Sequence, residues 1–298
     1  MKYTCVLLAL NSLFLVGLQP QIATATTLYT GEDLPEKQGW LVPGAIQSNG
    51  NPILDVSNFQ QVDPVTEAFT LQTNNIDPNS VSPFAGYLGY TNYFAQPPIF
   101  SELQLVNSGF PELNTDDVYS IFFKVAVKSL SEDNLDRAAF SVIAISSDVT
   151  KGIELDFEED LIFAQSDTLD STGASEFIRA ETSTPIVTSD SNSYELRVNL
   201  STYELFANGD RILDGNLRDY EFNINATNPN LPFNPYETPN FLFFGDLTDE
   251  AAGDFTLGEV RVKAAIASTP EGNFILALAL IGIGLTNGQS RLRPFRAE

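Results

Sequence analysis

The chain has 298 residues, 15 of them basic and 39 acidic, with no histidine, a formal net charge of −24 and 43% hydrophobic residues. This is the composition of a folded protein, and its charge excludes a nucleic-acid-binding role, because phosphate contacts need clustered Lys and Arg. The absence of histidine excludes Ser-His-Asp and Cys-His catalysis and imidazole zinc sites.

Residues 1–25 have the features of a secretory signal peptide. Lys2 supplies the positive charge, an apolar stretch runs from Val6 to Leu18, and Ala23-Thr24-Ala25 is a small-x-small cleavage site. The apolar stretch is shorter than the roughly 20 residues that span a bilayer, which argues against a permanent anchor. We therefore expect a helical signal, export by the Sec route and removal of the only cysteine, Cys5, so that disulfides cannot stabilise the mature chain.

Residues 26–268 show short runs with a hydrophobic period of two and almost no helical spacing. Phe123, Val125 and Val127 alternate with polar or small residues, and the run 194–200 alternates in the same way, as half-buried strands do. The stretches 138–145 and 241–244 are continuously apolar, which is typical of strands covered on both faces. No linker or repeat divides this region, so we expect one all-β domain built as an antiparallel two-sheet sandwich.

Asn208-Gly209 joins two further runs of this kind, 203–207 and 210–213. An Asn-Gly pair is the commonest signal for a two-residue type I′ turn, because both turn positions need φ above zero. The sequence therefore predicts a β-hairpin at this point.

A set of short motifs is spread over residues 28–263. They are Leu28-Tyr29, Leu34-Pro35, Gln38-Gly39-Trp40, Ala139-Phe140-Ser141-Val142, Gly152-Ile153-Glu154-Leu155, Ala164-Gln165, Leu217-Arg218-Asp219-Tyr220 and Pro239-Asn240-Phe241-Leu242-Phe243-Phe244-Gly245-Asp246. Together they resemble exported concanavalin A-like (laminin-G-like) jelly-roll domains, and more narrowly the cyanobacterial ones that are attached to variable C-terminal anchors. The resemblance implies two antiparallel sheets, one of them concave, with carbohydrate or protein ligands on the concave face or at the loop rim and calcium often at the rim.

The run 153–158 reads Ile-Glu-Leu-Asp-Phe-Glu. Strict alternation directs its apolar side chains to the core and its three carboxylates, Glu154, Asp156 and Glu158, to the opposite face. Repulsion among them has to be relieved by solvent, by a cation or an arginine, or by a raised pKa of one carboxyl group. The simplest interpretation is a solvated acidic face, paired with arginines of neighbouring strands.

The same string resembles the catalytic signature of retaining endo-β-glucanases of the concanavalin A-like class. That resemblance implies Glu154 as nucleophile, Glu158 as acid/base and Asp156 as the residue that tunes them. However, the carboxyl groups of a retaining pair lie about 5.5 Å apart, whereas positions i and i+4 of a straight strand lie about 13 Å apart. The single Trp, Trp40, also leaves no row of Trp platforms for a glucan chain.

Four acids are gathered in the Gly-containing stretch 245–254. Hard oxygen ligands of this kind suit Ca²⁺, and Asp246, Asp249 and Asp254 are the candidate ligands. The alternative is a rim turn in which Asp246 and Thr248 bond backbone N–H groups.

Arg137, Arg218 and Asp219 are candidates for hydrogen bonds to a sugar on the concave face, the arginines through their planar forks. The alternative is that these residues balance buried acids. Tyr90, with Tyr87 and Tyr93 on either side of it, is a candidate for stacking on a sugar ring or for capping a loop over the core.

Residues 269–298 form a tripartite tail. Pro270-Glu271-Gly272 is followed by an uncharged run at 274–285 and then by three arginines between positions 291 and 296. This order resembles the PEP-CTERM sorting signal, in which a Pro-Glu-Pro, a short hydrophobic helix and a basic end are recognised and usually cut by an exosortase. We expect a sorting enzyme as partner and transient membrane contact through 274–285, with a buried terminal helix as the alternative.

These observations favour a secreted jelly-roll protein of the outer surface or extracellular matrix that binds polysaccharide or a matrix component without catalysis. A strongly negative surface repels anionic polymers, so the expected ligand is a neutral glycan or a Ca²⁺-bridged acidic one. Two alternatives stay open, a β-glucanase-like hydrolase that uses Glu154 and Glu158, and a purely structural extracellular module. The carbohydrate assignment rests on analogy of fold.

Overall fold

The computed structural model describes residues 25–38, 40, 60–63, 68–73, 88–95, 103–105, 109–132, 135–227, 233–248 and 250–264. All of these belong to the unit Met1–Ala265. The expected signal peptide, apart from Ala25, and the whole tail 269–298 lie outside the described residues. Within the described ranges no helix is long and apolar enough to cross a membrane.

The first sheet is antiparallel throughout. Its strands are β1 (Thr26–Tyr29), β2 (Gln60–Asp63), β3 (Ala68–Gln72), β7 (Tyr119–Glu132), β12 (Asn192–Asn199), β13 (Thr202–Ala207), β14 (Asp210–Asn216) and β16 (Ala251–Lys263). They follow the order β14-β13-β12-β7-β16-β3-β2, and β1 also pairs with β16. The long strands β7 and β16 therefore form the centre of this sheet.

The second sheet is antiparallel as well. Its strands are β4 (Leu88–Thr91), β8 (Ser141–Ile145), β9 (Gly152–Phe157), β10 (Ile162–Leu169), β11 (Ser175–Thr182) and β15 (Phe241–Asp246), in the order β11-β10-β9-β8-β15-β4. A further pair is made by β5 (Tyr93–Ala95) and β6 (Leu103–Leu105). The helical elements of the described residues are η1 (Pro35–Gln38), α1 (Ile224–Thr227) and η3 (Pro235–Glu237).

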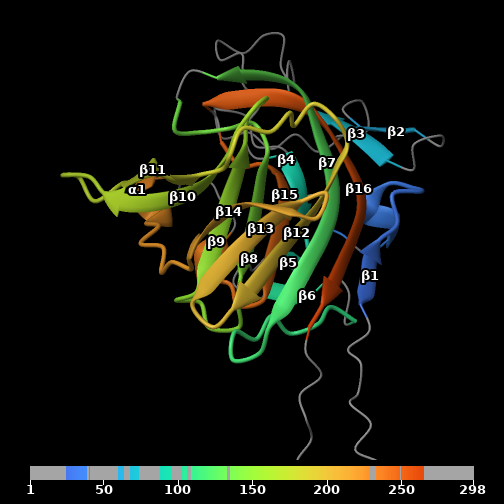
Figure 1. Ribbon diagram of the computed structural model, residues 1–298. Helices are drawn as coiled ribbons and strands as arrows, with labels where there is room; N and C mark the ends of the chain where they lie inside the picture. Colours follow the sequence, from blue (N-terminus) through green and yellow to red (C-terminus); the bar gives the residue numbers. More distant parts are fainter. Residues whose placement is uncertain are drawn as a thin grey trace, which may run out of the picture. The chain divides into compact units, whose positions relative to one another are not determined.

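Aromatic rings join the two sheets into one core. Phe123 and Tyr194 come from the first sheet, and their ring centroids lie 5.3 Å apart. Phe157 and Phe244 come from the second sheet and meet them edge-on, at 5.3 Å for Phe157–Tyr194 and 5.5 Å for Phe123–Phe244. Figure 1 shows strands β7, β12, β13 and β14 in front of β8 and β9. The prediction of an all-β, antiparallel two-sheet jelly-roll sandwich is confirmed.

The local predictions agree with the strands except in two places. Leu200, the last residue of the predicted run 194–200, is exposed and follows β12, because it begins the two-residue turn to β13. β12 alternates between buried and more exposed side chains, and β15 is buried on both faces. In the predicted run 138–145, however, the strand begins only at Ser141. Ala138, Ala139 and Phe140 are buried, as the apolar run predicts, but they precede the strand.

The predicted hairpin at Asn208-Gly209 is confirmed, with φ of 51° and 95° at the two turn positions. We expect Gly209→Val to lower the free energy of unfolding by about 1–2 kcal/mol, because left-handed backbone is costly for a residue with a Cβ atom. A steric clash does not contribute to this loss, since a Cβ at position 209 would meet nothing within 4 Å. Gly209→Asn is the matched control and should cost clearly less, because Asn adopts this conformation more readily. Equal losses for the two variants in urea denaturation would contradict this explanation.

Candidate functional site

The outer face of the second sheet is covered by a segment of the chain between β14 and β15. This cover segment comprises residues 217–227 and 233–238. A second apolar cluster fills the space beneath it, made of Ile143, Ile145, Tyr220, Phe222, Tyr236, Phe241 and Phe243. The rings of the cover segment also contact one another, at 4.7 Å for Tyr220–Tyr236 and 5.2 Å for Phe222–Tyr236. The face that carries the acidic residues of β9 is therefore not an open surface.

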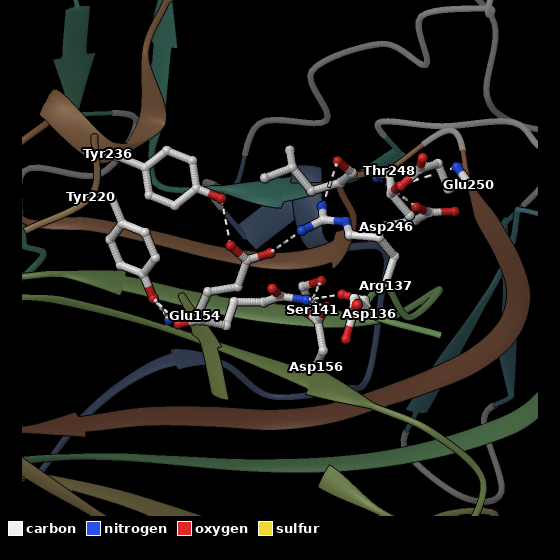
Figure 2. A network of polar contacts seen from close by, with 12 residues as sticks. Asp136, Arg137, Ser141, Glu154, Asp156, Tyr220, Tyr236, Asp246, Thr248 and Glu250 are labelled. Carbon is white, nitrogen blue, oxygen red and sulfur yellow. Dashed lines mark hydrogen bonds and ion pairs between the residues drawn. The ribbon is translucent and has the colours of Figure 1, made fainter. Parts of the chain in front are cut away.

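Glu154 lies beneath the cover segment with no exposed surface. The hydroxyl of Tyr236 donates a hydrogen bond to Glu154 Oε2, and Glu154 Oε1 lies 3.6 Å from Nη1 of Arg137. Tyr220 holds the backbone at the same point, since its hydroxyl accepts from the Glu154 N–H at 2.8 Å and donates to the Gln165 carbonyl at 3.0 Å. Figure 2 shows the Glu154 carboxylate between the Tyr236 hydroxyl and the Arg137 guanidinium.

Asp156 is equally buried and is held by two other strands. Its Oδ1 accepts from the Ser141 hydroxyl of β8, and its Oδ2 accepts from Gln165 Nε2 of β10 at 2.7 Å. Glu158 follows β9 with 14% of its side chain exposed and forms an ion pair with Arg179 of β11. Each carboxylate of the run 153–158 thus has its own partners within the fold.

The predicted alternation of this run is confirmed, but the interpretation as a solvated acidic face is wrong. Its apolar residues are buried in the main core, and Glu154 and Asp156 are buried on the other side. Glu154 lies beneath Tyr220 and Tyr236 of the cover segment, and Asp156 is enclosed with Ser141 and Gln165 as its partners. Arginines pair with Glu154 and Glu158, but not from directly neighbouring strands as expected. Arg137 precedes β8 outside any strand, and Arg179 lies on β11, which is separated from β9 by β10.

Burial raises the pKa of Glu154 to about 7, and the negative charge of Asp156 acts in the same direction. Arg137 and the Tyr236 hydrogen bond oppose this rise in pKa. At 3.6 Å the guanidinium is too far away to donate a good hydrogen bond, so it offsets only part of the cost of burying the charge. The pKa of Asp156 is also raised by burial, against Arg137 and the bonds from Ser141 and Gln165.

The predicted calcium stretch forms a turn at its first residues. Asp246 is buried, and its Oδ1 accepts the Thr248 N–H at 3.0 Å, while Thr248 Oγ1 accepts the Glu250 N–H at 3.1 Å. The rim-turn alternative is therefore confirmed for Asp246 and Thr248. Asp254 lies on β16, and Asp249 is outside the described residues. Among the residues that the structure describes, no group of three or more possible metal ligands gathers, so calcium binding stays a prediction.

The residues proposed for sugar binding have different surroundings. Arg137 is buried between Glu154, the Leu247 carbonyl and the ring of Phe177. Arg218 forms an ion pair with Glu181, and its backbone bonds to that of Gly152. Asp219 is exposed, and Tyr90 belongs to β4, with its side chain outside the description. For both arginines the alternative of balancing acids is confirmed.

Sequence reasoning missed Tyr236 and Gln165, which hold the two buried carboxylates. Tyr236 lies 82 residues from Glu154 in the chain, and no period or motif links them. Gln165 was part of the family resemblance, but its pairing with Asp156 needs the register of β9 and β10.

No family model and no curated protein matches the sequence. Among solved structures, alginate lyase A1-II′, a member of polysaccharide lyase family 7, is 13% identical with a TM-score of 0.41, covering 76% of this chain and 95% of its own. A carbohydrate esterase from the Shiga toxin-encoding bacteriophage phi24B is 11% identical with a TM-score of 0.45, covering 82% of this chain and 100% of its own. LamAcat from Zobellia galactanivorans is 13% identical with a TM-score of 0.42, covering 82% of this chain and 98% of its own. At these values the similarity carries no argument about activity.

Proposed function

We propose that this chain is a secreted polysaccharide-binding β-sandwich protein that leaves the polysaccharide intact. The absence of cleavage is supported most strongly by the burial of Glu154 and Asp156, both with no exposed surface. A retaining hydrolase needs its two carboxyl groups beside the glycosidic bond. In this protein Glu154 is covered by Tyr236, and Glu158 is paired with Arg179.

The carbohydrate part of the proposal follows from fold-level analogy. Jelly-roll sandwiches carry binding, hydrolytic and structural roles, so the fold alone does not choose among them. The place of action, on the outer surface or in an extracellular matrix, is proposed from the sequence of residues 1–25 and of the tail 269–298. The same tail is the proposed site for a sorting enzyme and for transient membrane contact.

Thermal unfolding of the full chain with soluble neutral and acidic glycans, with and without Ca²⁺, tests this proposal. A ligand that binds only the folded state raises the midpoint by mass action, and we expect such a rise with at least one neutral glycan. The glycan recovered afterwards should keep its length, and Glu154→Gln should bind it as the parent protein does. Shortening of the glycan by the parent protein but not by Glu154→Gln would instead establish the hydrolase. No shift with any glycan would favour the structural module.

A further inference from the structure

A groove with a volume of about 630 Å³ lies on the outer face of the first sheet, over β12, β13 and β14. Its lining includes Arg197 and Asn199, which alternate along β12 with the buried core residues Leu196 and Val198. The groove is therefore on the opposite side of the first sheet from the core. Its volume falls within the roughly 300–1,000 Å³ that is usual for ligand pockets.

The lining side chains form two cross-strand rows. In the first row, Arg197 pairs with Glu204 and Glu204 pairs with Asp214; in the second, Asn199 pairs with Thr202 and Thr202 pairs with Asn216. Because positions i and i+2 of a strand point to the same face, the two rows lie side by side. One row is charged and the other is uncharged.

The charges in the groove cancel one another. Arg197 lies 3.8 Å from Glu204, and Arg211, which also lines the groove, lies 3.2 Å from Glu204 and 3.6 Å from Asp214. Two lining arginines thus face two lining carboxylates, and Arg197 also pairs with Glu195 at 3.0 Å, in a chain whose net charge is −24. A ligand without charge avoids both the repulsion of the chain as a whole and the breaking of these ion pairs.

The uncharged row suits the hydroxyl groups of a sugar. Asn amides donate and accept hydrogen bonds, as a sugar hydroxyl does. The Thr202 hydroxyl donates to the Asn199 carbonyl at 3.0 Å and can still accept a hydrogen bond. Among the described residues, neither the Asn199 nor the Asn216 side chain takes part in a hydrogen bond that holds the fold. Both amides therefore face the groove with their hydrogen-bonding capacity unused within that part of the chain.

An apolar rim adjoins the uncharged row. Val118 lines the groove with 47% of its surface exposed, and Leu200, next to Asn199, is 58% exposed. Leu200 is the first residue of the two-residue loop between β12 and β13, and this turn accounts for its φ of 55°. A sugar ring has C–H faces as well as hydroxyl edges, and an apolar rim beside a polar row matches both.

We propose that this groove is the glycan site and that it takes a short segment of a neutral polysaccharide. The inference rests on the proposed function, because it names the site and the ligand class for that function. The buried acidic network of β9 takes no part in this binding.

Isothermal titration calorimetry of the full chain tests the assignment, with cellohexaose, laminarihexaose, xylohexaose and mannohexaose as neutral probes and oligogalacturonate as the anionic one. We expect one or more neutral probes to bind, and Asn199→Ala/Asn216→Ala to weaken that binding at least tenfold with an unchanged melting temperature. Thr182→Ala, an exposed change on β11 of the other sheet, is the matched control and should bind as the parent protein does.

Each other outcome contradicts a defined part of the account. Equal affinity of the double variant would overturn this site and leave the proposed function standing. Binding of oligogalacturonate in preference to the neutral probes would overturn the ligand class. Absence of binding by the parent protein to every probe would contradict both the site and the proposed function.

Discussion

The free energy of unfolding is expected to fall as the pH rises from about 5 to about 8, and Glu154→Gln is expected to remove part of that fall. The pKa of Glu154 is about 7 in the folded protein, against an ordinary value of 4.5. Between these values the folded state binds the proton more tightly than the unfolded state does, so stability is highest at the acidic end and declines as the carboxyl ionises. A difference of this size corresponds to roughly 3 kcal/mol.

Burial also raises the pKa values of Asp156 and Asp246, which contribute with the same sign. Asp167 acts in this direction as well. Burial raises its pKa to about 6 from 3.8, but the group is only half-buried, so solvent reduces its effect on stability. The decline in the Glu154→Gln variant should therefore be smaller than in the parent protein rather than absent.

Urea denaturation of the full chain at pH 5, 6, 7 and 8 measures this dependence. The readout is the slope of the free energy of unfolding against pH, because the substitution also changes the surroundings of Arg137 at every pH. Glu176→Gln removes an exposed carboxylate of β11 and should leave the parent slope nearly unchanged. A Glu154→Gln variant with the same slope as the parent protein would refute the linkage.

Phe157→Ala is expected to be the most destabilising single change, at about 3–5 kcal/mol, because it leaves a cavity in the centre of the core. The Phe157 ring contacts three other buried rings, at 5.3 Å from Phe140, 5.3 Å from Tyr194 and 6.2 Å from Phe123. Phe123 and Tyr194 belong to the first sheet and Phe157 belongs to the second, so the cavity would weaken the contact that joins the two sheets.

Urea denaturation at pH 6 measures this loss, with Phe157→Leu as a graded variant that keeps most of the volume and should cost less. Ile178→Ala removes a partly exposed side chain of β11 and should cost well under 1 kcal/mol. If Phe157→Ala does not fold, Phe157→Leu still tests the prediction. A loss below about 1 kcal/mol for Phe157→Ala would show that this ring does not join the sheets.

The sandwich was predictable because its signals are local. The alternation of β12 and the Asn-Gly turn each depend on neighbouring residues, and the structure has both. The continuously apolar β15 was read correctly as buried on both faces, and this already implied a second layer over the sheet. The sequence did not show what forms that layer.

The burial of Glu154 was not predictable, because the contacts that cover it are not local in the sequence. Its cover comes from Tyr220 and Tyr236, in a segment with little regular structure and no hydrophobic period. An alternating strand indicates which side chains share a face, but it does not indicate whether that face meets water or another segment. The groove over β12–β14 was missed because its two rows require the register of three strands.

The ionisation of Glu154 is the most direct test of the claim that the acidic face of β9 is closed. Carbon-13 NMR of the carboxyl groups of the full chain, with Glu154→Gln to assign the signal, would follow its titration between pH 3 and pH 9. We predict a midpoint near 7 that is unchanged by a bound neutral oligosaccharide. A midpoint near the ordinary value of 4.5 would place the carboxyl group in water and contradict the account, because Glu154 would then be accessible to a substrate.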